Sequence, residues 1–174
     1  MHGQLFTSDF LREGIRETHE WNAAENEFVS FRQAIRALFS TLPIETVLNE
    51  VQTEDDVILP VLAALGWTQH LRQQTANSKG RHDVPDFLLF ATPDAKQTAR
   101  SESNPDRRNR HGTLIVEAER WLRPLDRDDG TDPLDTGTPS SQMLRYLSRV
   151  EVASDRGLQW GVLTNGAVWR LYWQ

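Results

Sequence analysis

Residues 113–125 read TLIVEAERWLRPL, and the first half of this stretch has the composition of a buried strand. The run from Thr113 to Val116 is apolar for most of its length, as expected of a central strand that is covered on both faces. It ends in two glutamates, Glu117 and Glu119. Side chains alternate along a strand, so both carboxylates are expected on the same face as Ile115. Buried like charges repel, and a shared divalent cation such as Mg²⁺ would relieve that repulsion.

Other strand-like segments precede and follow the one that ends in the glutamates. They cover residues 67–75, residues 84–91 (VPDFLLFA) and the two halves of LQWGVLT–NG–AVWRLYW. The central strand itself is expected over residues 112–120. Asn165-Gly166 favours a type I′ turn, so the C-terminal halves are expected to form a hairpin.

Two helices are predicted within this strand pattern. The first lies in TEDDVILPVLAALGW, with Thr53 as N-cap, a kink at Pro60 and an end at Gly66. Its Glu54 falls on the same face as a stripe of apolar residues: Ile58, Val61 and Leu65. The second helix begins near Ser140, and its apolar side carries Met143, Leu147 and Val150.

The remaining segments are predicted to be helical near the N-terminus and irregular elsewhere. Ser8 is the expected cap of a first helix, and a second places Phe28, Phe31, Ile35, Leu38 and Phe39 on one face. Residues 91–111 are polar and without period, which is typical of a mobile surface loop. The expected fold is α/β: a sandwich with a mixed central sheet, preceded by a helical extension over residues 1–50.

Composition narrows the class of protein. The chain has 174 residues, 38% of them apolar, a net charge of −6 and no cysteine. Disulfides and thiolate metal sites are therefore excluded. No apolar stretch approaches the roughly 18–20 residues that span a membrane, and the N-terminus lacks a signal peptide, so a cytoplasmic protein is expected. The acidic charge argues against a wholly basic nucleic-acid coat.

A third carboxylate, Asp86, stands between Pro85 and the strand FLLF. A hairpin partner strand would carry it beside Glu117. Carboxylates arranged in this way can hold a metal ion that activates water and stabilises charge on a phosphate, as metal-assisted phosphodiester hydrolysis requires.

Five pieces taken in order resemble the PD-(D/E)xK nuclease superfamily: TEDDVILPVLAALGW, PDFLLF, VEAERW, QMLRY and WGVLTNGAVWRLYW. More narrowly, they resemble the N-terminal nuclease domain of type IIG/Eco57I-like restriction–modification enzymes and of the related type I restriction subunits. The resemblance covers the chain from about Thr53 to its end. It implies a restriction-endonuclease-like αβββαβ core over residues 51–174 with a C-terminal β-hairpin, and a metal-dependent endonuclease that acts on double-stranded DNA.

The resemblance also implies roles for individual residues. Asp86 and Glu117 would bind Mg²⁺, with Mn²⁺ as a substitute, and Glu54 would support the site from its helix. Gln142 and Tyr146 match the superfamily's Gln-x-x-x-Tyr element near DNA, with Arg149 alongside. Methyltransferase and target-recognition regions would follow in the same longer polypeptide, and cutting both strands would call for a dimer on DNA.

One position departs from the family pattern. The family usually has lysine where this chain has Glu119, which cannot supply positive charge but can act as a general base or as a further metal ligand. Arg120 points to the opposite strand face, and Lys79 is a candidate to reach in from the preceding segment. Two rival readings stay open: a nuclease-like fold that has lost cleavage and binds DNA or regulates, and a protein-interaction module.

Overall fold

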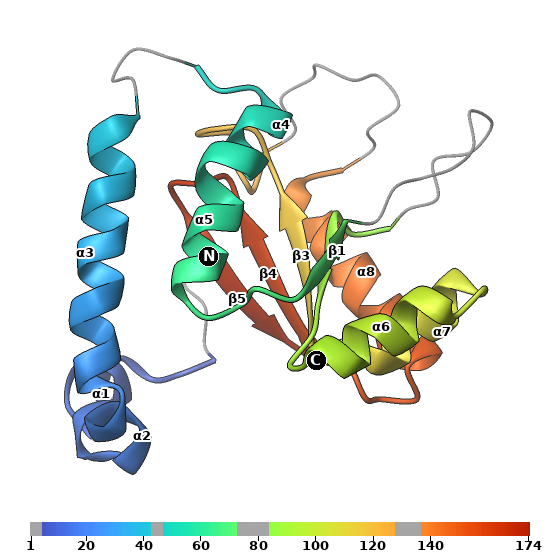
Figure 1. The fold of residues 1–174 in the computed structure, drawn as a ribbon, viewed down its shortest axis with the longest axis horizontal. Helices are drawn as coiled ribbons and strands as arrows, with labels where there is room; N and C mark the ends of the chain where they lie inside the picture. The colour runs from blue at the N-terminus through green and yellow to red at the C-terminus, as the bar shows by residue number, and fades with distance from the viewer. Residues whose placement is uncertain (1–4, 43–46, 73–83, 128–136) are drawn as a thin grey trace. The chain divides into compact units, whose positions relative to one another are not determined.

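The structure, a computed structural model, describes residues 5–42, 47–72, 84–127 and 137–174 (Figure 1). The chain divides into two units, Met1–Thr46 and Val47–Gln174. This boundary lies between residues 46 and 47, close to the expected one between residues 50 and 51. In the described part of the chain, no helix combines the length and the apolar character that crossing a membrane requires.

The first unit is helical, as predicted. It contains α1 (Ser8–Arg12), the 3₁₀ turn η1 (Gly14–Glu17), α2 (His19–Ala23) and α3 (Glu25–Thr41). The cap of α1 is Thr7, not Ser8, because the Thr7 hydroxyl accepts a hydrogen bond from the Phe10 N–H at 3.1 Å.

The second unit is built on a mixed sheet of five strands in the order β1-β2-β3-β4-β5. The pairing of β3 with β4 is parallel, and the other three pairings are antiparallel. The strands are β1 (His70–Arg72), β2 (Phe87–Leu89), β3 (Leu114–Ala118), β4 (Trp160–Thr164) and β5 (Trp169–Trp173). The predicted mixed α/β class is confirmed, and each strand is shorter than its predicted segment.

Helices cover the two faces of the sheet and create two apolar clusters. On one face, α5 (Leu59–Ala64) packs against Leu114 and Val116 of β3. On the other face, α8 (Pro139–Ala153) packs against Ile115. This alternation confirms the faces predicted for β3, and it places Glu117 on the α8 side of the sheet.

The helix before β1 is continuous but changes its winding. It consists of α4 (Glu50–Thr53), the π-helical turn η2 (Glu54–Ile58) and α5. Its N-cap is Asn49, which forms a capping box with Gln52; the predicted cap Thr53 was wrong, because the favourable turn begins four residues earlier. Pro60, where a kink was predicted, lies in the first turn of α5, directly after the π turn.

The end of this helix and its apolar face differ partly from the prediction. Gly66 follows the helix with a φ of 88°, as a left-handed stop requires. Glu54, Ile58 and Val61 are buried together, as predicted. Leu65 is 51% exposed, so its predicted place in the buried stripe was wrong.

Residues 91–111 are not the loop that their polarity predicted. They form α6 (Pro93–Ser101), α7 (Pro105–Arg108) and the 3₁₀ turn η3 (Asn109–His111). The overlooked signal is Thr92 followed by Pro93: the Thr92 hydroxyl caps the Ala95 N–H, and proline occupies the first turn. Ala99 is completely buried, which anchors α6 to the α8 side of the core.

The C-terminal hairpin of β4 and β5 is confirmed, but its turn is not type I′. The register pairs Thr164 with Trp169 and leaves Gly166-Ala167 as the central residues. Of these two only Gly166 has a positive φ, of 81°, whereas a type I′ turn needs positive φ at both. Asn165 instead accepts hydrogen bonds from the N–H groups of Ala167 and Val168 through its side-chain oxygen.

Candidate metal centre

Asp86 and Glu117 face each other where β2 begins and β3 ends. The antiparallel register pairs Phe87 with Val116, which puts Asp86 opposite Glu117. The Ala118 N–H donates to Asp86 Oδ2 at 2.7 Å, and the main chain of Asp86 acts to lower the pKa of Glu117. The predicted placement of Asp86 beside Glu117 on a partner strand is confirmed, and a main-chain hydrogen bond holds the Asp86 carboxylate in place.

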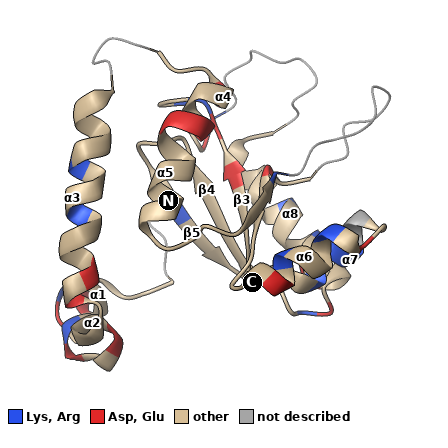
Figure 2. Ribbon diagram, viewed as in Figure 1, with Lys and Arg blue, Asp and Glu red and all other residues tan. Residues whose placement is uncertain are grey.

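Two further carboxylates, Glu50 and Glu54, belong to the helix that precedes β1 and lie near Asp86. Oxygens of Glu50, Glu54 and Asp86 lie within 4.8 Å of one another, a spacing that allows a metal ion to be shared. Figure 2 shows acidic residues on the α4–η2 stretch and on β3. Glu54 enters the site from the first residue of the π turn, a type of irregularity that often accompanies functional sites.

Burial and mutual repulsion make these groups reluctant to ionise. Burial raises the pKa of Asp86 to about 7, opposed by its bond from Ala118 and reinforced by Glu54, Glu50 and Glu119. Burial also raises the pKa of Glu117 well above its usual value, with Asp86, Glu119 and Glu50 adding to the effect. The pKa of Glu54 is raised by burial and partly restored by Arg72.

Glu117 has one carboxylate oxygen that no described group satisfies. Glu117 is only 6% exposed, and its Oε2 atom has no hydrogen-bond partner among the described residues. A buried anionic oxygen without a partner is expensive, and a cation at that point would remove the cost. The chemistry of the donors, all of them carboxylate oxygens, suits Mg²⁺ or Mn²⁺.

Two arginines pair with the outer carboxylates of the site. Arg72 Nη2 lies 3.2 Å from Glu54 Oε2, and the guanidinium is stacked over the Phe87 ring at 5.3 Å from its centroid. Arg123 Nη1 lies 2.6 Å from Glu119 Oε2. Within the described residues, neither Asp86 nor Glu117 forms an ion pair with Arg, Lys or His. The inner carboxylates are therefore the ones left to attract a cation.

Glu119 lies just past the end of β3 and is almost completely buried, at 2% exposure. Its N–H donates to the Thr164 carbonyl at 2.8 Å, which continues the alignment of β3 with β4. Its negative charge acts on both Asp86 and Glu117. Glu119 thus belongs to the cluster, although its carboxylate is engaged by an arginine.

The residues predicted to face DNA are on α8. Gln142 Nε2 donates to the Tyr146 hydroxyl at 2.6 Å, so the pair meets at the i, i+4 spacing as expected. Tyr146 is only 4% exposed and packs in the α8 cluster. Arg149 lies on the exposed side of the same helix, beside Arg145. Of the three, Arg149 is the most accessible to a partner.

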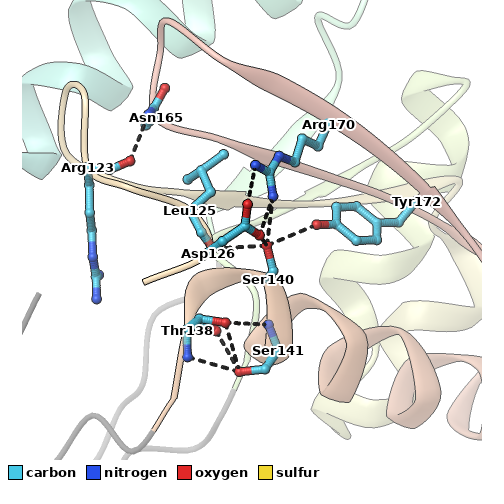
Figure 3. Close-up of polar contacts among 9 residues, drawn as sticks. All are labelled: Arg123, Leu125, Asp126, Thr138, Ser140, Ser141, Asn165, Arg170 and Tyr172. Carbon is cyan, nitrogen blue, oxygen red and sulfur yellow. Dashed lines mark hydrogen bonds and ion pairs between the residues drawn. The ribbon is translucent and has the colours of Figure 1, made fainter. Parts of the chain in front are cut away.

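A polar network fixes the segment that follows the carboxylates (Figure 3). Asp126 receives two hydrogen bonds from the Arg170 guanidinium, at 2.6 and 2.7 Å, and one from the Ser140 hydroxyl. The Asn165 amide donates to the Arg123 carbonyl at 2.8 Å. These contacts tie the residues after β3 to the start of α8 and to the C-terminal hairpin.

Sequence reasoning found Asp86, Glu117, Glu119 and Glu54 but missed Glu50, Arg72 and Arg123. Glu50 and Arg123 each carried a detectable signal, because each stands four residues from a recognised glutamate. No such signal marked Arg72, which meets Glu54 only through the fold. Lys79, suggested as a substitute cation, lies outside the described residues.

Comparison of the chain with protein-family models, with curated proteins and with solved structures found no match.

Proposed function

We propose that residues 47–174 form a metal-dependent endonuclease domain that hydrolyses phosphodiester bonds in double-stranded DNA. The observation that carries the proposal is the unsatisfied, buried Glu117 Oε2 directly beside Asp86. Phosphate recognition gives no reason to bury negative charge of this kind, whereas cation binding does.

The order of elements supports the finer fold proposal. One helix (α4 to α5), three strands, the helix α8 and the strand β4 follow one another in the αβββαβ order of restriction-endonuclease-like cores. The helices α6 and α7 would then be an insertion between the second and third strands. The setting that we propose, restriction of foreign DNA with methyltransferase and target-recognition regions elsewhere in the polypeptide, rests on the resemblance alone.

Asp86 and Glu117 are the proposed ligands of Mg²⁺ or Mn²⁺, with Glu54 and Glu50 beside them. When bound, the ion would activate a water and stabilise the negative charge that develops on the phosphate. The protein's own part is to hold the ligands rigidly. The Ala118 N–H orients the Asp86 carboxylate, and Arg72, which pairs with both Glu54 and Asp55, partly offsets the charge of Glu54.

The direct test is nicking of supercoiled plasmid in Mg²⁺ or Mn²⁺ by wild type, Asp86→Asn and Glu117→Gln. Asp56→Asn is a matched control, since Asp56 is an exposed acid on the same helix as Glu54. Cleavage that is lost in the first two variants and kept in the control supports the nuclease.

A second candidate function is a nuclease-like module that binds metal and DNA without cutting. It is favoured by the Glu119–Arg123 ion pair, which stands where the resembling nucleases have lysine. Mn²⁺-dependent thermal stabilisation that Asp86→Asn abolishes, in the absence of any nicking, would establish this alternative. If the protein shows no nicking and no metal-dependent stabilisation, both candidate functions are overturned.

A further inference from the structure

The chain makes a tight, well-anchored turn immediately after β3. The Trp121 N–H donates to the buried Thr53 hydroxyl at 2.8 Å, and the Arg123 N–H donates to the Arg120 carbonyl at 3.0 Å. Leu122 has a φ of 61°, in the left-handed region that a bulky residue rarely adopts. Such strain persists only where the surroundings impose it, and it concentrates at functional sites.

This turn brings Arg123 back onto Glu119. The Asn165 amide holds the Arg123 carbonyl, and the Arg123 side chain points away from the Asp126–Arg170 pair (Figure 3). The Arg123 side chain is 12% exposed and the Glu119 side chain 3% exposed, so the ion pair at 2.6 Å is largely shielded from water. A buried pair with short contacts fixes the orientation of both partners more firmly than a surface pair does.

Glu119 follows Glu117 by two residues, and its N–H continues the alignment of β3 with β4, so the two glutamates leave the strand on the same face. The charge of Glu119 already acts on Asp86 and Glu117. A cation bound to the inner pair would attract the Glu119 carboxylate, because opposite charges in a poorly hydrated site are only weakly screened. The ion pair with Arg123 competes directly with that attraction.

We infer that Arg123 is a positioning residue that withholds Glu119 from the metal, leaving Asp86 and Glu117 as the inner ligands. The inference rests on the proposed metal centre and deepens it. Arg72 occupies the corresponding place on the other flank, against Glu54. The two arginines thus set which carboxylates are neutralised by the protein and which by the ion, and Glu119 is an anchor for Arg123 rather than a further ligand.

The test measures Mn²⁺ affinity by titration calorimetry, which needs no cleavage. Arg123→Met removes the arginine that contacts Glu119 and is expected to tighten Mn²⁺ binding by about tenfold. Arg123→Lys keeps a cation at this place and is expected to keep the wild-type affinity. The double variant Arg123→Met/Glu119→Gln, which removes both charges, is expected to return to the wild-type affinity. Arg127→Met, which removes an exposed arginine four residues further on, serves as control.

A merely structural Arg123 gives a different pattern. Arg123→Met would then lower the unfolding temperature while Mn²⁺ affinity stayed at the wild-type value, and this result would overturn the inference. If Asp86→Asn abolishes Mn²⁺ binding but Arg123→Met leaves it unchanged, the proposed centre stands and only the role of Arg123 falls. If the wild type binds no Mn²⁺, the proposed centre itself fails and the inference falls with it.

Discussion

Asp86 and Glu117 lie opposite each other across the antiparallel pair of β2 and β3, and the N–H of Ala118, next to Glu117, donates to Asp86 Oδ2 at 2.7 Å. The strand register places the two residues side by side where β2 begins and β3 ends. Burial raises the pKa of both carboxyl groups, Glu119 and Glu50 raise both further, and Asp86 also raises the pKa of Glu117. The fold therefore carries an electrostatic cost at this point in the metal-free protein.

Removing the charge of Glu117 is expected to stabilise the metal-free protein. Glu117→Gln replaces a buried carboxyl group, whose ionisation lowers stability, with a neutral amide of similar shape. We therefore expect the free energy of unfolding to rise by about 1–3 kcal/mol at pH 8. Urea unfolding in EDTA measures it. Glu151→Gln, at a half-buried position on α8 away from the cluster, is the control; a loss of stability in Glu117→Gln would contradict the cost assigned to this carboxylate.

Stability of the metal-free protein is expected to fall as pH rises from about 4 to about 7. The folded-state pKa of Asp86, about 7, lies above the ordinary value of 3.8, so the folded protein binds more protons in this window than the unfolded chain. The loss expected from Asp86 is between about 2 and 4 kcal/mol. Asp126, whose pKa the Arg170 pair lowers, has the opposite effect, and only below about pH 4.

Unfolding curves at several pH values check the prediction, with Asp86→Asn expected to show a shallower fall than wild type. A wild-type stability that rises between pH 4 and pH 7 would show that other groups outweigh Asp86.

Metal affinity is expected to increase with pH between 6 and 8. Ligand carboxylates must lose their protons before they bind, and the pKa of Asp86 lies inside this range. The shift in unfolding temperature caused by Mn²⁺ should therefore grow several-fold from pH 6 to pH 8. The same shift at both pH values would mean that Asp86 is already ionised at the lower one.

Thr53 links the acidic helix to the turn after β3, and its loss is expected to destabilise the core. Its fully buried hydroxyl donates to the Asn49 carbonyl and accepts from the Trp121 N–H. Thr53→Val removes both bonds and leaves the Trp121 N–H unsatisfied, at a cost of about 1–3 kcal/mol. Thr68→Val, at an exposed position, is expected to change the free energy of unfolding by less than about 0.5 kcal/mol. If the two variants change the free energy of unfolding by similar amounts, the linking role of Thr53 is contradicted.

The predicted DNA-facing residues of α8 are expected to act in different ways. Arg149→Ala removes an exposed charge and should weaken DNA binding. It should also lower the salt slope, which is the slope of log affinity against log salt concentration, by about 1, the contribution of one phosphate contact. Tyr146→Phe removes the bond from Gln142 within the core, so we expect about 1 kcal/mol less stability and the wild-type salt slope. Fluorescence anisotropy at several salt concentrations separates the two. An unchanged slope in Arg149→Ala would place DNA elsewhere on the domain.

Much of the architecture follows from local patterns in the chain. The uninterrupted apolar run of residues 114–116, the alternation that carries Glu117 with Ile115, and the apolar stripe of α8 were all readable, because strand and helix periods are local properties. The prediction for the polar segment 91–111 was wrong. Its composition predicted a loop, but the Thr92 cap and the buried Ala99 hold the helix α6 there.

The chain by itself determined which carboxylates exist and that Asp86 and Glu117 would meet across an antiparallel pair. Only the tertiary structure decided which of them are neutralised. Arg72 reaches Glu54 from a strand eighteen residues away, and Arg123, although only four residues from Glu119, meets it in a turn in which Leu122 is left-handed. Charge pairing depends on distance and burial in space, which periodicity along the sequence does not encode.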